Sequence, residues 1–324
     1  MMTALSYNAQ WVLFSTLLLG MAAGVIGCFA YWKRQSLMSD ALSHAALPGV
    51  IIGFAVMGVK SMPVMLAGAA VSALLGALLI HWIRTSSRVK EDTAMGIVLS
   101  VFFGFGIMML TFVNRMEGGS QSGLDSFIFG QAASMVGKDV LIMASMAVLV
   151  ILVAGFGYKE WKLFLFDPDF SRGLGLSSRW MNSIYMAVLV LVIVIGIQAV
   201  GVILMAALLI IPAVSARYWT QSFKWMLVLS ALFGGGAGLV GTLVSIQGKG
   251  WPTGPFIVLA ASSLFVVSLV FGARKGLLIV YFQQRRQRKQ LLQAPTAGGG
   301  SGSATGAGAS TGAGAGTLER GSVS

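Results

Sequence analysis

The chain has 324 residues, of which 56% are hydrophobic and only 10% are charged. Soluble domains carry about a quarter charged residues, so this composition excludes a soluble domain and indicates an integral membrane protein. The net charge of +12 does not indicate nucleic-acid binding, because the basic residues cluster in alternate loops between apolar segments. The single cysteine, Cys28, excludes a disulfide framework and a cysteine metal cluster.

Nine apolar segments approach or exceed the roughly twenty residues that a helix needs to cross a bilayer. No basic residue precedes the first segment, and the segment is too long for the apolar core of a signal peptide. We therefore expect it to remain in the mature protein as a spanning helix. The predicted spans are residues 11–32, 37–59, 62–83, 94–113, 139–157, 181–197, 200–216, 225–246 and 255–273. The sixth and seventh are nearly continuous, and a tight turn near Gln198 divides them. We therefore predict an all-α polytopic bundle of about nine transmembrane helices, eight being possible.

Two further segments do not cross the membrane. Leu124 to Val136 is apolar but too short, so it is either an interfacial or re-entrant helix on the outer side or a surface loop. From Ala297 to Thr317 every residue is Ala, Gly, Ser or Thr, which buries too little apolar surface to become ordered. We therefore predict a transmembrane domain over residues 1–293. The remaining residues, 294–324, form a flexible tail that resembles an expression linker or a fusion scar.

The distribution of basic residues predicts an N-terminus outside and a C-terminus inside, because inner loops are enriched in Lys and Arg. The predicted outer segments hold only Lys60, Arg115, Lys138 and Lys249. The predicted inner segments hold Lys33, Arg34, Arg84, Arg88, Lys90, Lys159, Lys162, Arg172, Arg179, Arg217, Lys224 and the basic end from Arg274. The basic run from Arg285 to Lys289 is predicted to be a solvated helix end that touches anionic lipid on the inner face.

An acidic residue and one of the two histidines lie four residues apart at the head of the second span. Asp40 and His44 therefore share one helix face. Ionisable side chains are costly in hydrocarbon, so they usually face a protein interior or a polar pathway. Carboxylate oxygen and imidazole nitrogen also suit a divalent transition metal. We predict that this pair contacts a transported metal together with other groups or waters; alternatively, Asp40 caps the helix and His44 bonds a neighbouring helix.

Four further residues are candidates for lining the path of the transported metal: Ser39, Ser43, Pro48 and Gln198. Pro48, followed by a glycine, could break the helix and free carbonyl groups to line the path. Gln198 could line the path at the turn between the sixth and seventh spans, although helix packing is the favoured role there.

The inner loop from Tyr158 to Trp180 is the longest inner connection between clear spans. Asp167 followed by proline can start a short helix, since proline is tolerated in the first turn. Gly173 and Gly175 can end it. We therefore predict a short helix along the inner membrane face.

Six motifs, taken in order, resemble those of permease subunits of ATP-binding-cassette importers for manganese, zinc or iron. They are Ser39–Gly49, Lys90–Gly96, Leu124–Gly130, Gly201–Leu204, Ile211–Ala213 and Pro252–Pro255, and the likeness extends over about residues 10–285. Each motif is weak alone, but their order and spacing together are specific. One departure is Ser171, where the resemblance leads us to expect alanine.

The resemblance implies a homodimer in the bacterial cell membrane, with two separate ATPase subunits on the cytoplasmic face. It also implies an extracellular metal-binding lipoprotein, and it places Asp40 and His44 in the transport path. The expected ATPase-coupling residues of the inner loop are Asp167, Asp169, Phe170, Arg172, Gly173 and Gly175. The sequence has no Gly-x-x-x-x-Gly-Lys-Ser/Thr loop, so this chain is not expected to be an enzyme that hydrolyses ATP itself. We expect no covalently bound cofactor, and Mn²⁺ or Zn²⁺ is the favoured cargo.

Two other functions remain possible at this point. An ion-coupled secondary transporter would need more acidic residues near the bilayer midplane and often shows internal repeats. A permease of similar architecture could carry a metal chelate such as cobalamin or an iron–siderophore complex. Asp40 and His44 favour a bare ion over a chelate.

Overall fold

The computed structural model describes residues 7–57, 61–115, 130, 132, 135, 137–248, 251–274 and 276–279. They belong to one compact unit that covers residues 1–282. The predicted tail over residues 294–324, the basic run 285–289 and most of the predicted outer segment 124–136 lie outside the described residues.

Every regular element in the described part of the chain is a helix. The helices are α1 (Tyr7–Trp32), α2 (Ser36–Met57), α3 (Met62–Ser86), α4 (Glu91–Arg115), α6 (Gly137–Phe156), α7 (Tyr158–Phe166), α8 (Pro168–Gly173), α9 (Ser178–Val200), α10 (Val202–Trp219), α11 (Phe223–Gln247) and α12 (Thr253–Phe271). Within these residues nine helices, all except α7 and α8, are long and apolar enough to cross a membrane. Each overlaps one of the nine predicted spans, so the prediction of a polytopic helical bundle is confirmed.

Glycine and serine bring α1 and α11 into very close contact. A Cβ atom on Gly20 would lie 2.1 Å from the carbonyl oxygen of Gly234, and one on Gly24 would lie 2.2 Å from that of Ser230. The Ser230 hydroxyl donates a hydrogen bond of 2.5 Å to the Gly24 carbonyl. Small residues allow the two backbones to come this close. Close van der Waals packing holds helices together in a membrane, because lipid provides no hydrophobic driving force between them. Gly236 lies on another face, where an added Cβ would meet nothing within 4 Å.

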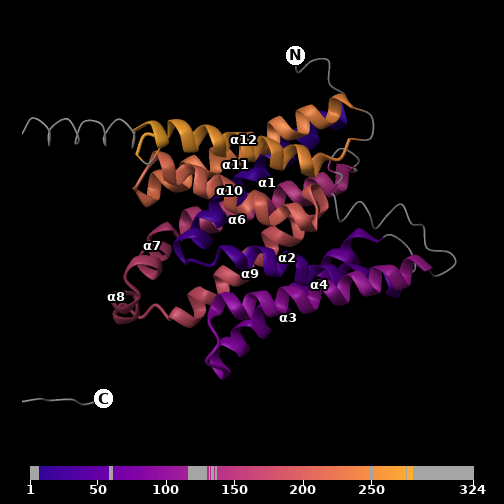
Figure 1. The fold of residues 1–324 in the computed structure, drawn as a ribbon, viewed down its shortest axis with the longest axis horizontal. Helices are drawn as coiled ribbons and strands as arrows, with labels where there is room; N and C mark the ends of the chain where they lie inside the picture. The colour runs from indigo at the N-terminus through magenta and orange to yellow at the C-terminus, as the bar shows by residue number, and fades with distance from the viewer. Residues whose placement is uncertain are drawn as a thin grey trace, which may run out of the picture. The chain divides into compact units, whose positions relative to one another are not determined.

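The helices on the two sides of α1 form distinct groups. Figure 1 shows α11 and α12 on one side, while α2, α3 and α4 lie together on the other. Helix α10 contacts both groups, since it packs against α11 and α12 and also against α2.

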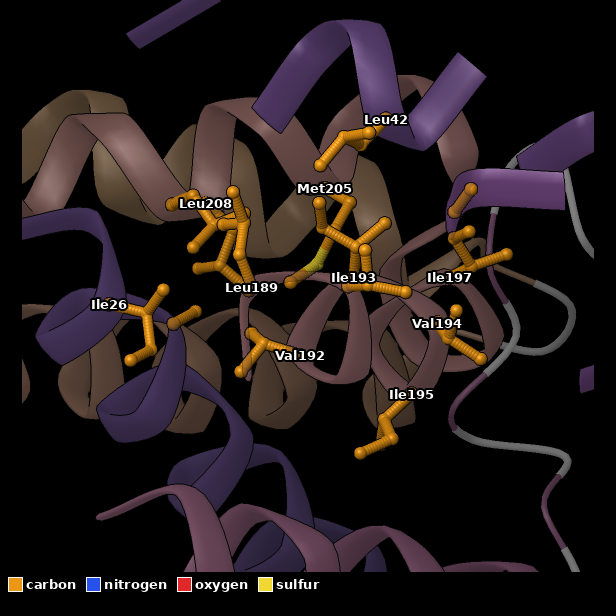
Figure 2. Packing of buried hydrophobic residues seen from close by; sticks show 14 of the residues in the cluster. Ile26, Leu42, Leu189, Val192, Ile193, Val194, Ile195, Ile197, Met205 and Leu208 are labelled. Atoms are coloured by element: carbon orange, nitrogen blue, oxygen red, sulfur yellow. The ribbon is translucent and has the colours of Figure 1, made fainter. Parts of the chain in front are cut away.

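The α9–α10 hairpin provides much of the core. Gly201 separates the two helices with a φ of 95°, a conformation that favours glycine. The predicted turn is therefore present, although α9 continues to Val200 rather than ending at residue 197. Figure 2 shows Leu189 and Ile193 of α9 close to Met205 of α10. The buried second half of α9 thus forms an apolar centre around which the other helices pack.

Candidate functional site

Helix α2 carries the predicted metal-contacting pair and runs without interruption through Pro48. The predicted helix break at this proline is therefore not present. Proline has no N–H to donate, so the carbonyl of His44, four residues earlier, loses its usual helical partner. The next carbonyl, that of Ala45, accepts a hydrogen bond of 2.6 Å from the Ser72 hydroxyl of α3. The helix is thus supported from outside at the point where its own hydrogen bonding is weakened.

Asp40 and His44 lie together, as their spacing predicts. The distance from His44 Nε2 to Asp40 Oδ1 is 3.4 Å, and the two side chains are 13% and 35% exposed, respectively. His44 Nδ1 is buried and has no hydrogen-bond partner among the described residues. The Phe103 ring of α4 meets the imidazole edge-on, with ring centroids 4.7 Å apart. One ring nitrogen thus faces a carboxylate while the other lacks a partner, a combination suited to a metal-binding histidine.

The depth of the pair follows from helix geometry. Asp40 and His44 are four and eight residues beyond Ser36, so they lie about 6 and 12 Å along the helix axis. The hydrocarbon core is about 30 Å thick, and in the predicted orientation α2 begins at the inner face. That orientation predicts His44 in the inner half of the bilayer and Asp40 nearer its inner boundary.

The two candidate serines of α2 are fully buried and bond within their own helix. The Ser39 hydroxyl donates to the carbonyl of Ser36 at 2.9 Å, and the Ser43 hydroxyl donates to the carbonyl of Ser39 at 2.7 Å. In this conformation neither hydroxyl is presented to an open path.

Gln198 lies on a different helix from the pair and is buried near the end of α9. Its Nε2 atom has no hydrogen-bond partner within the described part of the chain. Leu42, which lies between Asp40 and His44 in the sequence, points toward Met205 of α10 (Figure 2). Residues two positions apart project from nearly opposite sides of a helix, so the pair faces away from the α9–α10 hairpin. No described contact joins Gln198 to the pair.

The predicted inner helix is present as α8. Asp167 accepts a hydrogen bond of 3.0 Å from the backbone N–H of Phe170, which caps the helix start. Arg172 pairs with Asp169 within the same helix. Beyond its end at Gly173, Gly175 adopts a φ of 82°. The aspartate–proline start and the glycine end thus act as the sequence predicts.

Helices α7 and α8 project together from one end of the unit (Figure 1). Phe170 of α8 and Leu174 after it are 55% and 58% exposed. Both side chains lie outside the helices that are long and apolar enough to cross a membrane. Ser171, in contrast, is fully buried, and its hydroxyl has no partner among the described residues.

Comparisons with known proteins agree with this architecture. The model of the ABC 3 transport family matches residues 6–272. The chain belongs to the ABC 3 transport family. It is 46% identical over 292 residues to the manganese transport system membrane protein MntC of Bacillus subtilis (strain 168), covering 89% of this chain and 67% of that protein. It is 44% identical over 287 residues to the zinc transport system membrane protein TroC of Treponema pallidum (strain Nichols), covering 89% and 96%, respectively.

A solved structure also resembles this ABC 3 family member. A chain of PsaBC from Streptococcus pneumoniae in complex with Fab matches it with a TM-score of 0.74 and 31% sequence identity. The match covers 85% of this chain and 96% of that chain. The expected resemblance to importer permeases is therefore confirmed, and the chain is a multi-pass membrane permease. The family favours an ATP-binding-cassette system over the ion-coupled secondary transporter.

A polar cluster that no sequence motif indicated joins the ends of several helices of this ABC 3 family member. Lys33 Nζ lies 2.5 Å from Asn182 Oδ1 of α9. Gln35 donates through Nε2 to Glu91 Oε1 at the start of α4. Arg84 Nη1 of α3 lies 3.2 Å from Glu91 Oε2. The sequence predicted only an orientation signal from Lys33, since the members of the cluster are far apart in the chain.

Proposed function

We propose that this chain is the permease subunit of a bacterial importer that moves a divalent transition metal ion, Mn²⁺ or Zn²⁺, into the cytoplasm. The observation that carries the proposal is the Asp40–His44 pair, which offers oxygen and nitrogen donors inside an apolar bundle. The names of the manganese and zinc relatives support the choice of cargo. Because the sequence lacks a phosphate-binding loop, ATP hydrolysis belongs to separate subunits.

The pair supplies only part of a metal coordination sphere. Within the described residues no group of three His, Cys, Asp or Glu side chains is placed to hold a metal ion. Asp40 and His44 therefore act with water or with the same pair of a second copy. Incomplete coordination suits a transport path, because the ion must leave as readily as it enters.

A homodimer is supported by the exposed face of α4. Gly96, Ser100 and Gly104 follow one another at four-residue spacing on this face, and all three are exposed. An added Cβ on either glycine would meet nothing within 4 Å. Such small residues permit close approach of a second helix. Phe103, beside His44, lies on the same helix, so a dimer contact here would place two Asp40–His44 pairs near each other.

The α7–α8 segment is the proposed contact for the ATPase subunits. Its exposed residues, including Asp169, Phe170 and Arg172, lie outside the membrane-spanning helices. In the predicted orientation this segment is cytoplasmic, and the outer face is left for a metal-delivering lipoprotein. Binding and hydrolysis of ATP then displace the segment and open the path alternately to each side.

Uptake of Mn²⁺ into proteoliposomes tests this function. The permease is reconstituted with its ATPase subunits and the metal-loaded delivery protein. We expect Asp40→Ala and His44→Ala to lower the ATP-dependent uptake rate about ten-fold or more, the scale of loss when metal-site groups are removed. His81→Ala and Asp92→Ala are matched controls, since they remove an exposed histidine and an exposed aspartate elsewhere.

Three outcomes would contradict the proposal. Uptake that continues without ATP would exclude the ABC importer, and equal uptake of an iron–siderophore complex would favour the chelate permease. If the Asp40→Ala and His44→Ala complexes assemble and transport at the control rate, the pair is not the metal-contacting site.

A further inference from the structure

The connection between α1 and α2 is a single tight turn. The Gln35 N–H bonds the Ala30 carbonyl at 2.9 Å, and the Arg34 N–H bonds the Tyr31 carbonyl at 3.1 Å. This is the hydrogen-bond pattern of a Schellman motif, which usually has glycine at the position of Arg34. Arg34 adopts a φ of 58° and is the one non-glycine residue with positive φ in the described part of the chain. The turn therefore fixes the start of α2 relative to the end of α1.

Lys33 joins this turn to two elements on the cytoplasmic side. Its Nζ lies 2.5 Å from Asn182 Oδ1 and 4.3 Å from the centroid of the Tyr185 ring, both on α9. The same Nζ lies 5.2 Å from the ring centroid of Phe164 on α7. Ammonium groups are attracted to aromatic faces at these distances, more strongly when they are partly desolvated.

Aromatic packing fixes α7 against the end of α1. The rings of Trp32 and Phe166 have centroids 4.8 Å apart, and those of Phe29 and Trp161 are 5.3 Å apart. A displacement of α7 therefore acts on the last turn of α1 directly, next to Lys33. Packed aromatic contacts transmit displacement because they do not compress.

Gln35, on the other side of the turn, joins the group of α2, α3 and α4. Its side-chain amide donates to Glu91 at the start of α4, and Glu91 pairs with Arg84 near the end of α3. Ser36, the next residue after Gln35, begins the helix that carries Asp40 and His44. Lys33 and Gln35 thus connect the α7–α9 side and the α3–α4 side through one short turn.

We propose that Lys33 is a positioning residue that transmits displacement of the α7–α8 segment to the start of α2, and so to the Asp40–His44 pair. The inference rests on the proposed function, because it assumes that the ATPase subunits act on α7–α8. The Lys33 ammonium orients α9 and α7 relative to the turn, so its loss uncouples ATP hydrolysis from transport without removing a metal ligand.

The charge on Lys33 is sensitive to its surroundings. Burial lowers the pKa of Lys33 to about 8; the nearby Glu91 opposes this shift, and Arg84 adds to it. Tyr185 of α9 is a further titratable group that lies against the ammonium. As the internal pH rises through about 8, the ammonium loses its proton and its attraction to the Tyr185 and Phe164 rings weakens.

The test measures Mn²⁺ uptake and ATP hydrolysis together in the reconstituted complex. We expect Lys33→Met to retain ATP hydrolysis while the amount of Mn²⁺ transported per ATP falls about three-fold or more, a typical effect of a residue in a coupling network. Lys33→Arg, which keeps the charge, should restore most of the ratio. Arg88→Met is the matched control, because it removes one exposed charge from the same predicted side.

The internal pH provides a second measurement that a purely structural role would not affect. We expect the wild-type ratio of Mn²⁺ to ATP to fall between internal pH 7 and 9, and the Lys33→Arg ratio to stay level, since arginine keeps its charge in this range. An unchanged ratio in Lys33→Met, or identical pH profiles for wild type and Lys33→Arg, would overturn the inference while leaving ATP-driven uptake intact. Absence of ATP-driven uptake in the wild type would instead remove the proposed function and, with it, the inference.

Discussion

At Ser171 the protein buries a hydroxyl group in the middle of α8. The side chain is fully buried, and its Oγ has no hydrogen-bond partner among the described residues. A buried polar group without a partner costs about 1–3 kcal/mol of stability. Serine is also a weaker helix former than alanine. Serine at position 171, where the family resemblance leads us to expect alanine, therefore lowers the stability of the folded protein.

Replacement of this hydroxyl should not destabilise the protein. We expect Ser171→Ala to leave the free energy of unfolding unchanged or to raise it by about 1 kcal/mol. The measurement is thermal unfolding of the purified protein in detergent. Ser230→Ala is the contrasting variant, because the Ser230 hydroxyl bonds the Gly24 carbonyl across two helices. A larger loss of stability in Ser171→Ala than in Ser230→Ala would show that the Ser171 hydroxyl has a partner in the folded protein.

At the scale of elements, the contact between α1 and α11 depends on the absence of side chains. An added Cβ on Gly24 would overlap the Ser230 carbonyl oxygen at 2.2 Å. Neither backbone can move without separating the helices along several turns. The contact is therefore selective for glycine on steric grounds, independently of any conformational preference.

A larger side chain in this contact should separate the two helices. We expect Gly24→Val to lower stability by about 2 kcal/mol or more, the usual cost of overpacking a close contact. Gly236→Val is the matched control on α11, because an added Cβ there meets nothing within 4 Å. Comparison of the melting temperatures of the two variants gives the measurement. Equal melting temperatures would contradict the close contact.

Apolar length and local helix signals were enough to predict the elements. The nine spans follow from continuous apolar segments, and α8 follows from Asp167, the proline after it and the glycines at its end. The Asp40–His44 contact also follows from spacing within one helix. Each of these features depends on residues that are close together in the chain, so it can be predicted from the sequence.

Contacts between distant segments could not be predicted in this way. Lys33 and Asn182 are 149 residues apart in the chain, and Gln35 and Glu91 are 56 apart. No periodicity or short motif relates such positions, and Asn182 and Gln35 are common polar residues at helix ends. The predicted break at Pro48 was wrong for a similar reason, because tertiary packing, including Ser72 on the adjacent carbonyl, supports a continuous helix.

At the scale of the whole molecule, the predicted orientation places α7–α8 and the α11–α12 connection on opposite sides of the membrane. Leu174 follows α8 and Trp251 precedes α12, and both are exposed. The natural Cys28 is buried, so it should give little background in thiol labelling. The two exposed positions therefore form a matched pair for testing orientation.

Labelling of intact cells with a membrane-impermeant maleimide measures this orientation. We expect Trp251→Cys to react from outside, and Leu174→Cys to react only after the membrane is permeabilised. The basic residues of the inner segments provide the physical reason, because they resist translocation across the membrane. The reverse pattern would contradict the orientation and, with it, the cytoplasmic position of α7–α8.

The α1–α11 contact also has a consequence for biosynthesis. Gly24 and Ser230 are 206 residues apart, so the first helix enters the membrane long before its main partner has been translated. At about 5–20 residues per second, the ribosome needs roughly 10–40 s to reach that partner. During this interval the glycine face of α1 is open to lipid or to other nascent helices. Assembly of this permease is therefore completed from its C-terminal half, and a message truncated before α11 would leave the first helix without its partner.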